Sequence, residues 1–94
     1  METLKPAVFV KYLDGWNSEA MLVKLTEPVR FSFPDGPQET RYVIISAIHF
    51  PKETLIFPSD ADGNVLSFME LYGSCRGLFN HEIALNNLGY FLED

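Results

Sequence analysis

The segment Arg41–Phe50 constrains the fold most, because it is apolar along both of the faces that a β-strand presents. Successive side chains of a strand point to opposite sides. Apolar residues dominate both alternating sets, which are Tyr42, Ile44, Ile48 and Phe50 on one side and Val43, Ile45 and Ala47 on the other. A strand of this kind has to be covered on both faces. The sequence therefore predicts a central strand with structure packed above and below it.

Shorter segments rich in β-branched and aromatic residues predict further strands. They are Ala7–Leu13, Ala20–Thr26, Val29–Phe33 and Thr54–Phe57. Proline lacks the N–H that a sheet requires, so we expect Pro28 to interrupt the second run and Pro58 to end the last strand. Pro34–Pro37 is a strong turn signal. Val65–Tyr72 fits a strand or one or two helical turns, and we expect a strand start that runs into an irregular turn.

One helix is predicted, over His81–Leu88. Asn80 can accept from the free N–H groups of its first turn, Glu82 complements the positive end of the helix dipole, and Gly89 suits the left-handed residue that ends a helix. Tyr90–Leu92 is expected to return as a final strand or to pack against the sheet. These elements predict one α+β domain, residues 1–94. Its small, mostly antiparallel sheet has four to five strands, and one C-terminal helix packs on it.

The chain is acidic, with 7 Lys and Arg against 13 Asp and Glu and a formal net charge of −6. The imbalance lies mainly in residues 48–94, where two basic residues face seven acidic ones; residues 1–47 have five against six. Binding to nucleic acid requires a basic surface that neutralises phosphates, so no direct nucleic-acid binding is expected. An acidic surface either keeps a protein in solution or binds a partner with a basic surface.

Cys75 is the one cysteine, so no intramolecular disulfide is possible. No segment has the pattern of a signal peptide, and no apolar run approaches the roughly 18–20 residues needed to span a bilayer. We therefore expect no membrane association and a reducing cytoplasm as the location.

Asp60, Asp62 and Asn64 alternate in the way that the first three ligands of a calcium loop do. That loop also requires Gly at its sixth position and Glu at its twelfth, where this chain has Val65 and Leu71. We therefore expect a turn between strands rather than a metal site. Asp60 and Asp62 remain candidates for contact with a basic partner.

The loop Gly73–Gly77 contains a hydroxyl, a thiol and a guanidinium. Its N–H groups and Arg76 could hold an anion, or Arg76 could pair with a carboxylate in a tight structural loop. The loop has neither P-loop nor nucleophile-elbow spacing. Cys75 and His81 are six residues apart without a catalytic signature, and no metal-ligand spacing links them with His49. We expect no catalytic residue, no metal, no cofactor and no enzymatic activity.

Aromatic residues make up 14% of the chain, which is high for so small a core. Some of the rings are expected at the surface, where aromatic residues favour interfaces. Trp16 follows a glycine in a predicted loop and is a candidate anchor at an interface; the alternative is a core position.

The order of residues from about Ile45 to Tyr90 is itself distinctive. It comprises Ser46-Ala47, Glu53-Thr54, Ile56-Phe57-Pro58, Asp62-Gly63, Glu70-Leu71, Gly73-Ser74, Gly77, His81-Glu82, Ala84-Leu85 and Gly89-Tyr90. This order resembles a family of small proteins of unknown function associated with phages, prophages and their bacterial hosts. The chain departs from that pattern at Tyr72–Cys75, where a more open Gly-Ser-aromatic sequence is expected. The resemblance implies a phage-linked accessory protein, in the host cytoplasm if phage-encoded, and it supplies no activity.

Three functional hypotheses follow. The first is an acidic protein that binds another protein with a basic surface, for example an inhibitor of a host nucleic-acid-handling or defence complex such as an anti-CRISPR protein. Its contact residues would be Asp60, Asp62, Glu70, Glu82, Glu93 and Asp94. The second is a homodimer or larger homo-oligomer with an accessory role, paired through an edge strand or an aromatic patch. The third is a small anion-binding protein or enzyme that uses Gly73–Gly77 and Arg76.

Overall fold

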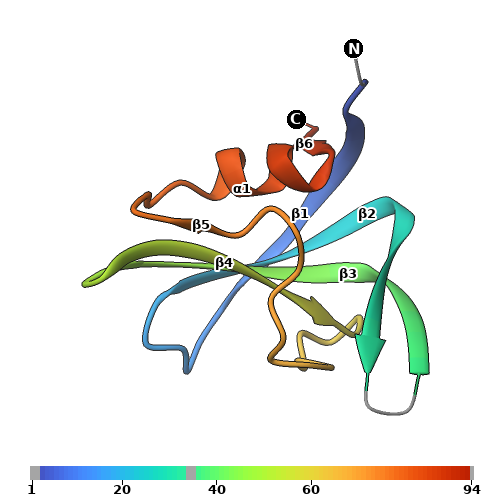
Figure 1. Ribbon diagram of the computed structural model, residues 1–94, viewed down its shortest axis with the longest axis horizontal. Helices are drawn as coiled ribbons and strands as arrows, with labels where there is room; N and C mark the ends of the chain where they lie inside the picture. The colour runs from blue at the N-terminus through green and yellow to red at the C-terminus, as the bar shows by residue number, and fades with distance from the viewer. Residues whose placement is uncertain (1–2, 34–35, 94) are drawn as a thin grey trace.

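A computed structural model describes residues 3–33 and 36–93 and shows a curved six-stranded sheet with one helix packed on it (Figure 1). The elements are β1 (Lys5–Leu13), β2 (Glu19–Phe33), β3 (Gly36–His49), β4 (Lys52–Ser59), β5 (Cys75–Arg76), α1 (His81–Leu88) and β6 (Tyr90–Leu92). The strand order is β5-β4-β3-β2-β1-β6. Neighbouring strands from β1 to β5 pair antiparallel, and β6 joins β1 in parallel. The predicted α+β class and the mostly antiparallel sheet are confirmed.

The predicted number of four to five strands is too low. β5 is only two residues long and forms because Cys75 and Arg76 pair with the edge of β4. A strand this short carries no periodicity from which it could be predicted. The expected strand start in Val65–Tyr72 is wrong: Val65 makes one isolated bridge to Ser59, and the segment is otherwise irregular.

Proline interrupts the strands less than expected. β2 continues through Pro28, because its register against β3 shifts between Lys24 and Val29 and so leaves an irregular stretch where an N–H is not needed. β4 extends past Pro58 to Ser59, in a part of the strand that β5 does not pair with. Pro34 and Asp35 of the predicted turn lie outside the described residues. The irregular stretch bends β2, as the downward turn of this strand in Figure 1 shows.

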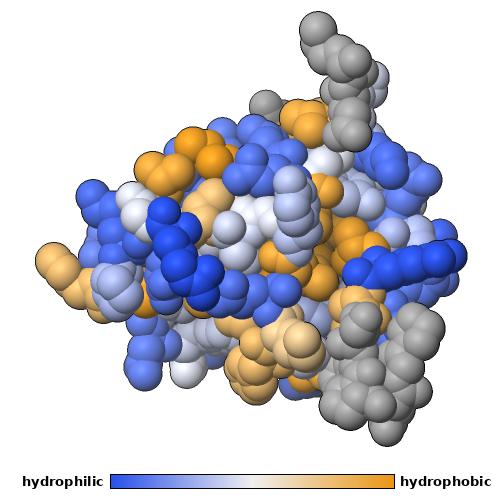
Figure 2. Space-filling model, viewed as in Figure 1, coloured by the Kyte–Doolittle hydropathy of each residue, from blue (hydrophilic) through white to orange (hydrophobic). Residues whose placement is uncertain are grey.

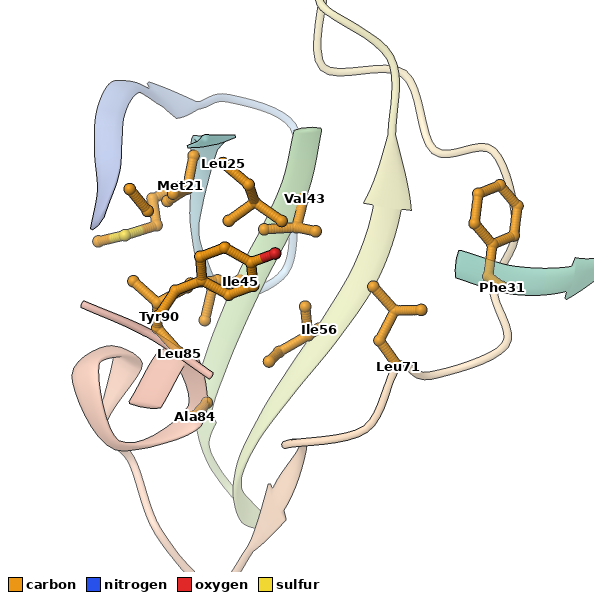
Figure 3. Packing of buried hydrophobic residues seen from close by; sticks show 12 residues of the cluster. Met21, Leu25, Phe31, Val43, Ile45, Ile56, Leu71, Ala84, Leu85 and Tyr90 are labelled. Carbon is orange, nitrogen blue, oxygen red and sulfur yellow. The ribbon is translucent and has the colours of Figure 1, made fainter. Parts of the chain in front are cut away.

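The central strand is β3, and both of its faces are covered, as predicted. Val43 and Ile45 are buried on the face toward α1, and Ile44 is buried on the opposite face. On the α1 face, side chains of the strands pack against the helix and the C-terminal residues, and Figure 3 shows Leu85 and Tyr90 turned toward β3. On the opposite face, a smaller cluster is closed by partly buried side chains from the loops, which include Trp16 and Val65.

The helix has the boundaries and caps that were predicted. Asn80 is extended, with φ −159° and ψ 104°, and its side chain accepts from the N–H of Ile83 at 3.0 Å. Gly89 ends the helix at φ 108°, where its N–H donates to Asn86 and Leu85 carbonyls. A second anchor comes from β4: the buried Thr54 hydroxyl donates to the carbonyl of Leu78 at 2.7 Å and accepts from the N–H of Asn80 at 2.9 Å. These bonds fix the start of α1 over the sheet.

Candidate functional site

The turn Asp60–Asn64 is held together by the Asp60 carboxylate. Its oxygens accept from the N–H groups of Asp62 and Asn64, both at 2.9 Å, and from the side-chain amide of Asn64 at 3.1 Å. The bonds from Asn64 are the main cause that lowers the pKa of Asp60 below its ordinary value of 3.8. Asp60 therefore stabilises its own turn, and Asp62 is exposed at the tip.

Arg76 is paired with carboxylates. Its Nη1 donates to Glu70 Oε2 at 3.1 Å and its Nη2 to the other oxygen of Glu70, while Nε lies 3.8 Å from Glu53. The hydrogen bonds and the charge of Glu70 raise the pKa of Arg76 above its ordinary value. This is the tight structural loop that the sequence left as one alternative, and it engages Glu70 as well.

The rest of the loop Gly73–Gly77 is also engaged within the fold. The Ser74 hydroxyl accepts from the N–H of Ile56 at 2.9 Å, and the N–H of Gly77 donates to the Lys52 carbonyl at 2.7 Å. Gly73 lies directly against α1, where a Cβ atom would be 2.8 Å from the Ala84 carbonyl oxygen. The loop thus contacts both β4 and α1, and these contacts engage the Ser74 hydroxyl and the Gly77 N–H within the fold.

Cys75 and His81 have separate partners. The thiol of Cys75 donates to the Gly73 carbonyl and accepts from the Asn87 side chain at 3.2 Å. The His81 Nε2–H donates to the carbonyl of Glu19 at 2.8 Å. Neither set of bonds joins the thiol to the imidazole, so the arrangement provides no thiolate–base pair.

Trp16 is half-buried and belongs to the cluster on the face opposite α1. Its ring centroid lies 6.0 Å from that of Phe57, and the Phe57 ring in turn meets Phe68 edge-on at 5.8 Å. Trp16 therefore contributes to packing while keeping part of its ring exposed. Trp16 is thus neither fully buried nor fully exposed, and its role as an interface anchor stays a prediction.

Sequence reasoning missed a groove between β1 and the start of α1, which has a volume of about 490 Å³. One wall comes from β1, where the pairing with β2 shifts register between Phe9 and Lys11. Val10 is the extra residue of this bulge. In a regular strand, residues three apart lie on opposite faces, but the bulge brings Phe9 and Tyr12 to the same face, with ring centroids 4.9 Å apart. Tyr12 is 69% exposed and Phe9 40%.

The second wall is held in place by contacts with the sheet. Phe79 stacks on His49, with ring centroids 4.1 Å apart and planes 2° apart, and it meets the ring of His81 edge-on at 5.7 Å. The residues on both sides of Phe79 are hydrogen-bonded to the Thr54 hydroxyl, through the carbonyl of Leu78 and the N–H of Asn80. The wall is therefore preorganised. His49 is exposed and supports Phe79 by stacking.

Charge in the groove comes from Glu82. Among the lining residues, all of them within the described ranges, it is the one carboxylate, and its side chain is exposed. It makes no ion pair with another described residue, in contrast to Glu27, Glu39, Glu53 and Glu70. Of the predicted binding residues within the described part of the chain, Glu82 alone borders the groove. The one sequence signal for the other lining residues was the excess of aromatic rings.

Apolar side chains also reach the surface elsewhere, and Figure 2 shows apolar areas on one face that are separated by hydrophilic residues. Phe68, Met69 and Tyr72 are exposed in the irregular segment before β5, and Phe50 is exposed in the turn between β3 and β4. Tyr72 lines a second pocket together with Glu70, but that carboxylate is already paired with Arg76. The groove beside α1 combines exposed rings with a carboxylate that makes no ion pair with another described residue.

Within the described ranges, no group of three or more His, Cys, Asp and Glu is placed to hold a metal ion. The same part of the chain contains no helix that is long and apolar enough to cross a membrane. No protein-family model matches the chain, and comparison with curated proteins and with solved structures gave no significant match. The resemblance to phage-associated proteins therefore stays a prediction.

Proposed function

We propose that the protein is a binding module that recognises an exposed basic segment of another protein in the groove between β1 and α1. The observation that carries this proposal is the combination of exposed aromatic rings with an unpaired carboxylate in one preorganised groove. Aromatic residues dominate the energetics of protein interfaces, because they bury a large area at a small cost in side-chain entropy.

The electrostatics favour a basic partner. The net charge of −6 attracts basic surfaces and repels the phosphates of nucleic acids. The acidic residues predicted to form one contact surface are used differently in the fold: Asp60 bonds within its turn, Glu70 pairs with Arg76, and Glu82 borders the groove. Asp94 lies outside the described residues. We therefore centre the contact on Glu82 and leave the other acids a long-range electrostatic role.

An inhibitory role in a phage-infected host follows from this proposal as its most specific form. A protein that occupies the basic surface of a nucleic-acid-handling or defence complex competes with the nucleic acid for that surface. The support for this form is the acidic charge together with the sequence resemblance. It predicts that partners of the protein lose nucleic-acid binding when the groove is occupied.

Selection from a random peptide library tests the proposal and does not require the partner to be identified first. We expect the immobilised protein to enrich peptides with basic and apolar residues. Tyr12→Ala should weaken the binding of the enriched peptides about tenfold, because it removes an exposed ring from the groove. Tyr72→Ala is the matched control, since Tyr72 is 85% exposed and lies outside the groove. Absence of enrichment, or equal effects of the two substitutions, would refute the proposal.

A second candidate, self-association through an edge strand, is favoured by one observation. β6 pairs with β1 only along Lys5–Ala7, and no described strand pairs with the outer side of the remainder of β1, where Val8 and Val10 are exposed. The bulge at Val10 and the exposed Lys11 argue against it, because bulges and lysines are features that protect edge strands from pairing. Sedimentation velocity over a wide concentration range decides: a dimer abolished by Val10→Lys supports it, and a monomer throughout excludes it.

A further inference from the structure

We infer that the groove beside α1 binds the guanidinium group of an arginine side chain of the partner. This inference rests on the proposed function and specifies the chemistry that the groove recognises. It concerns a part of the surface that Phe9, Tyr12 and Phe79 line together with Glu82.

The aromatic rings provide the first half of the recognition. A cation is attracted to the electron-rich face of an aromatic ring, and the interaction strengthens where water is partly excluded. Phe9 and Tyr12 form an angled wall, with their planes tilted by 59°. Phe79 cannot easily turn away, because His49 stacks on it and His81 meets it edge-on. A planar group that enters the groove therefore meets rings that are already oriented.

The carboxylate provides the second half. Glu82 lies in the first turn of α1, lines the groove and has no ion pair with another described residue. A guanidinium can donate two parallel N–H bonds to such a carboxylate. The same planar group can stack on a ring, which the tetrahedral ammonium of lysine cannot do. The groove therefore favours arginine over lysine.

Other occupants fit less well. An anion would face Glu82 in a chain of net charge −6. A nucleobase could stack on the rings, but its phosphates would be repelled by the same charge. A purely apolar side chain would leave the carboxylate unused and partly desolvated. These occupants are distinguishable outcomes of the experiment below.

The experiment uses N-acetyl-arginine amide as the probe, in an NMR titration of the full chain at physiological salt. We expect shifts at the ring resonances of Phe9, Tyr12 and Phe79. N-acetyl-lysine amide should bind more weakly, and N-acetyl-citrulline amide, which has a similar shape and no charge, should bind about tenfold more weakly or not at all. Equal binding of the arginine and citrulline probes, or shifts confined to other acidic residues, would overturn the inference.

A matched pair of variants tests whether the charge of Glu82 itself, rather than the net charge of the protein, attracts the arginine probe. Glu82→Gln should raise the Kd of the arginine probe about fivefold. Asp62→Asn makes the same change in net charge on the turn that lies across the sheet from α1 in Figure 1, and should leave the Kd nearly unchanged. Equal effects of the two variants would show a general attraction to the acidic surface and overturn the inference.

The inference and the proposed function fail in different ways. If library peptides bind and depend on Tyr12 while the arginine probe does not bind, the groove recognises proteins by another chemistry and only the inference fails. If the arginine probe binds but no library peptide is enriched, the groove is a cation site and the protein-binding function fails.

Discussion

Gly73 provides the sharpest test of how the segment before β5 packs on the helix. A Cβ atom at this position would lie 2.8 Å from the Ala84 carbonyl oxygen, 2.9 Å from the Leu88 nitrogen and 3.2 Å from Ile56 Cδ1. The first two are backbone atoms of α1, which cannot move away by a side-chain rotation. Gly73 also has a φ of +111°, a conformation that residues with a side chain rarely adopt. The substitution Gly73→Ala is therefore expected to strain both the loop and the helix.

The expected cost has two parts. A positive φ costs an alanine about 1–2 kcal/mol relative to glycine, and forcing a methyl group into a filled space costs about 1–3 kcal/mol. The sum is about 2–5 kcal/mol, which is a large fraction of the roughly 5–14 kcal/mol by which a domain of this length is stable. Gly77→Ala is the control, because Gly77 has a φ of +89° and no atom within 4 Å of the added Cβ. Gly77→Ala should show only the cost of the positive φ.

Urea denaturation followed by circular dichroism and by the fluorescence of Trp16 measures both variants. The free energy of unfolding of Gly73→Ala should fall below that of Gly77→Ala by about 1–3 kcal/mol, the cost of the contact with α1. Equal losses in the two variants, within about 0.5 kcal/mol, would refute the reasoning. Equal losses would mean that α1 moves away from the loop at no cost in free energy. The groove wall formed by the start of α1 would then not be rigidly held.

Three further substitutions, together with one control, test the anchors of the helix and the acidic turn. Thr54→Val removes the hydroxyl that bonds Leu78 and Asn80, so unfolding should become easier by about 1–3 kcal/mol and hydrogen exchange at the Asn80 amide should accelerate. Asn80→Ala removes the N-cap and should cost about 1 kcal/mol in urea denaturation, whereas Asn86→Ala, at an exposed position inside the helix, should be neutral or slightly stabilising. The pKa of Asp60 is lower in the folded state, so the ionised carboxylate stabilises the fold above pH 3.8, and this stabilisation is lost as the pH falls through the folded pKa. Asp60→Asn should therefore flatten the dependence of the urea midpoint on pH in the acid range.

The elements that the sequence predicts well are those whose signals are local. The caps at Asn80 and Gly89 bound the helix correctly, because a cap depends on a few neighbouring residues. The two-sided pattern of Arg41–Phe50 places this segment correctly as the central strand, because covering both faces is the only way to bury it. The two-residue strand β5 could not be predicted, since its pairing with β4 depends on where the preceding loop returns to the sheet.

The candidate site residues also differ in whether their contacts can be inferred from nearby sequence. Asp60 and Arg76 were correctly seen as groups with a structural alternative, and their partners lie within six residues of them or on the adjacent strand. Whether a carboxylate is paired or free depends on which side chains the fold brings beside it, and composition alone gives no information about it. That is why the sequence does not separate Glu82 from the other acids.

The groove depends on a single extra residue in β1. Without Val10 as a bulge, regular alternation would place Phe9 and Tyr12 on opposite faces of the sheet, and one wall of the groove would lose a ring. A bulge also disrupts the edge that β1 would otherwise offer to another strand. The same local irregularity thus makes strand pairing at this edge less favourable and places two aromatic side chains in the groove that Glu82 also lines. This coupling is the physical reason to rank recognition by side chains in the groove above self-association through β1.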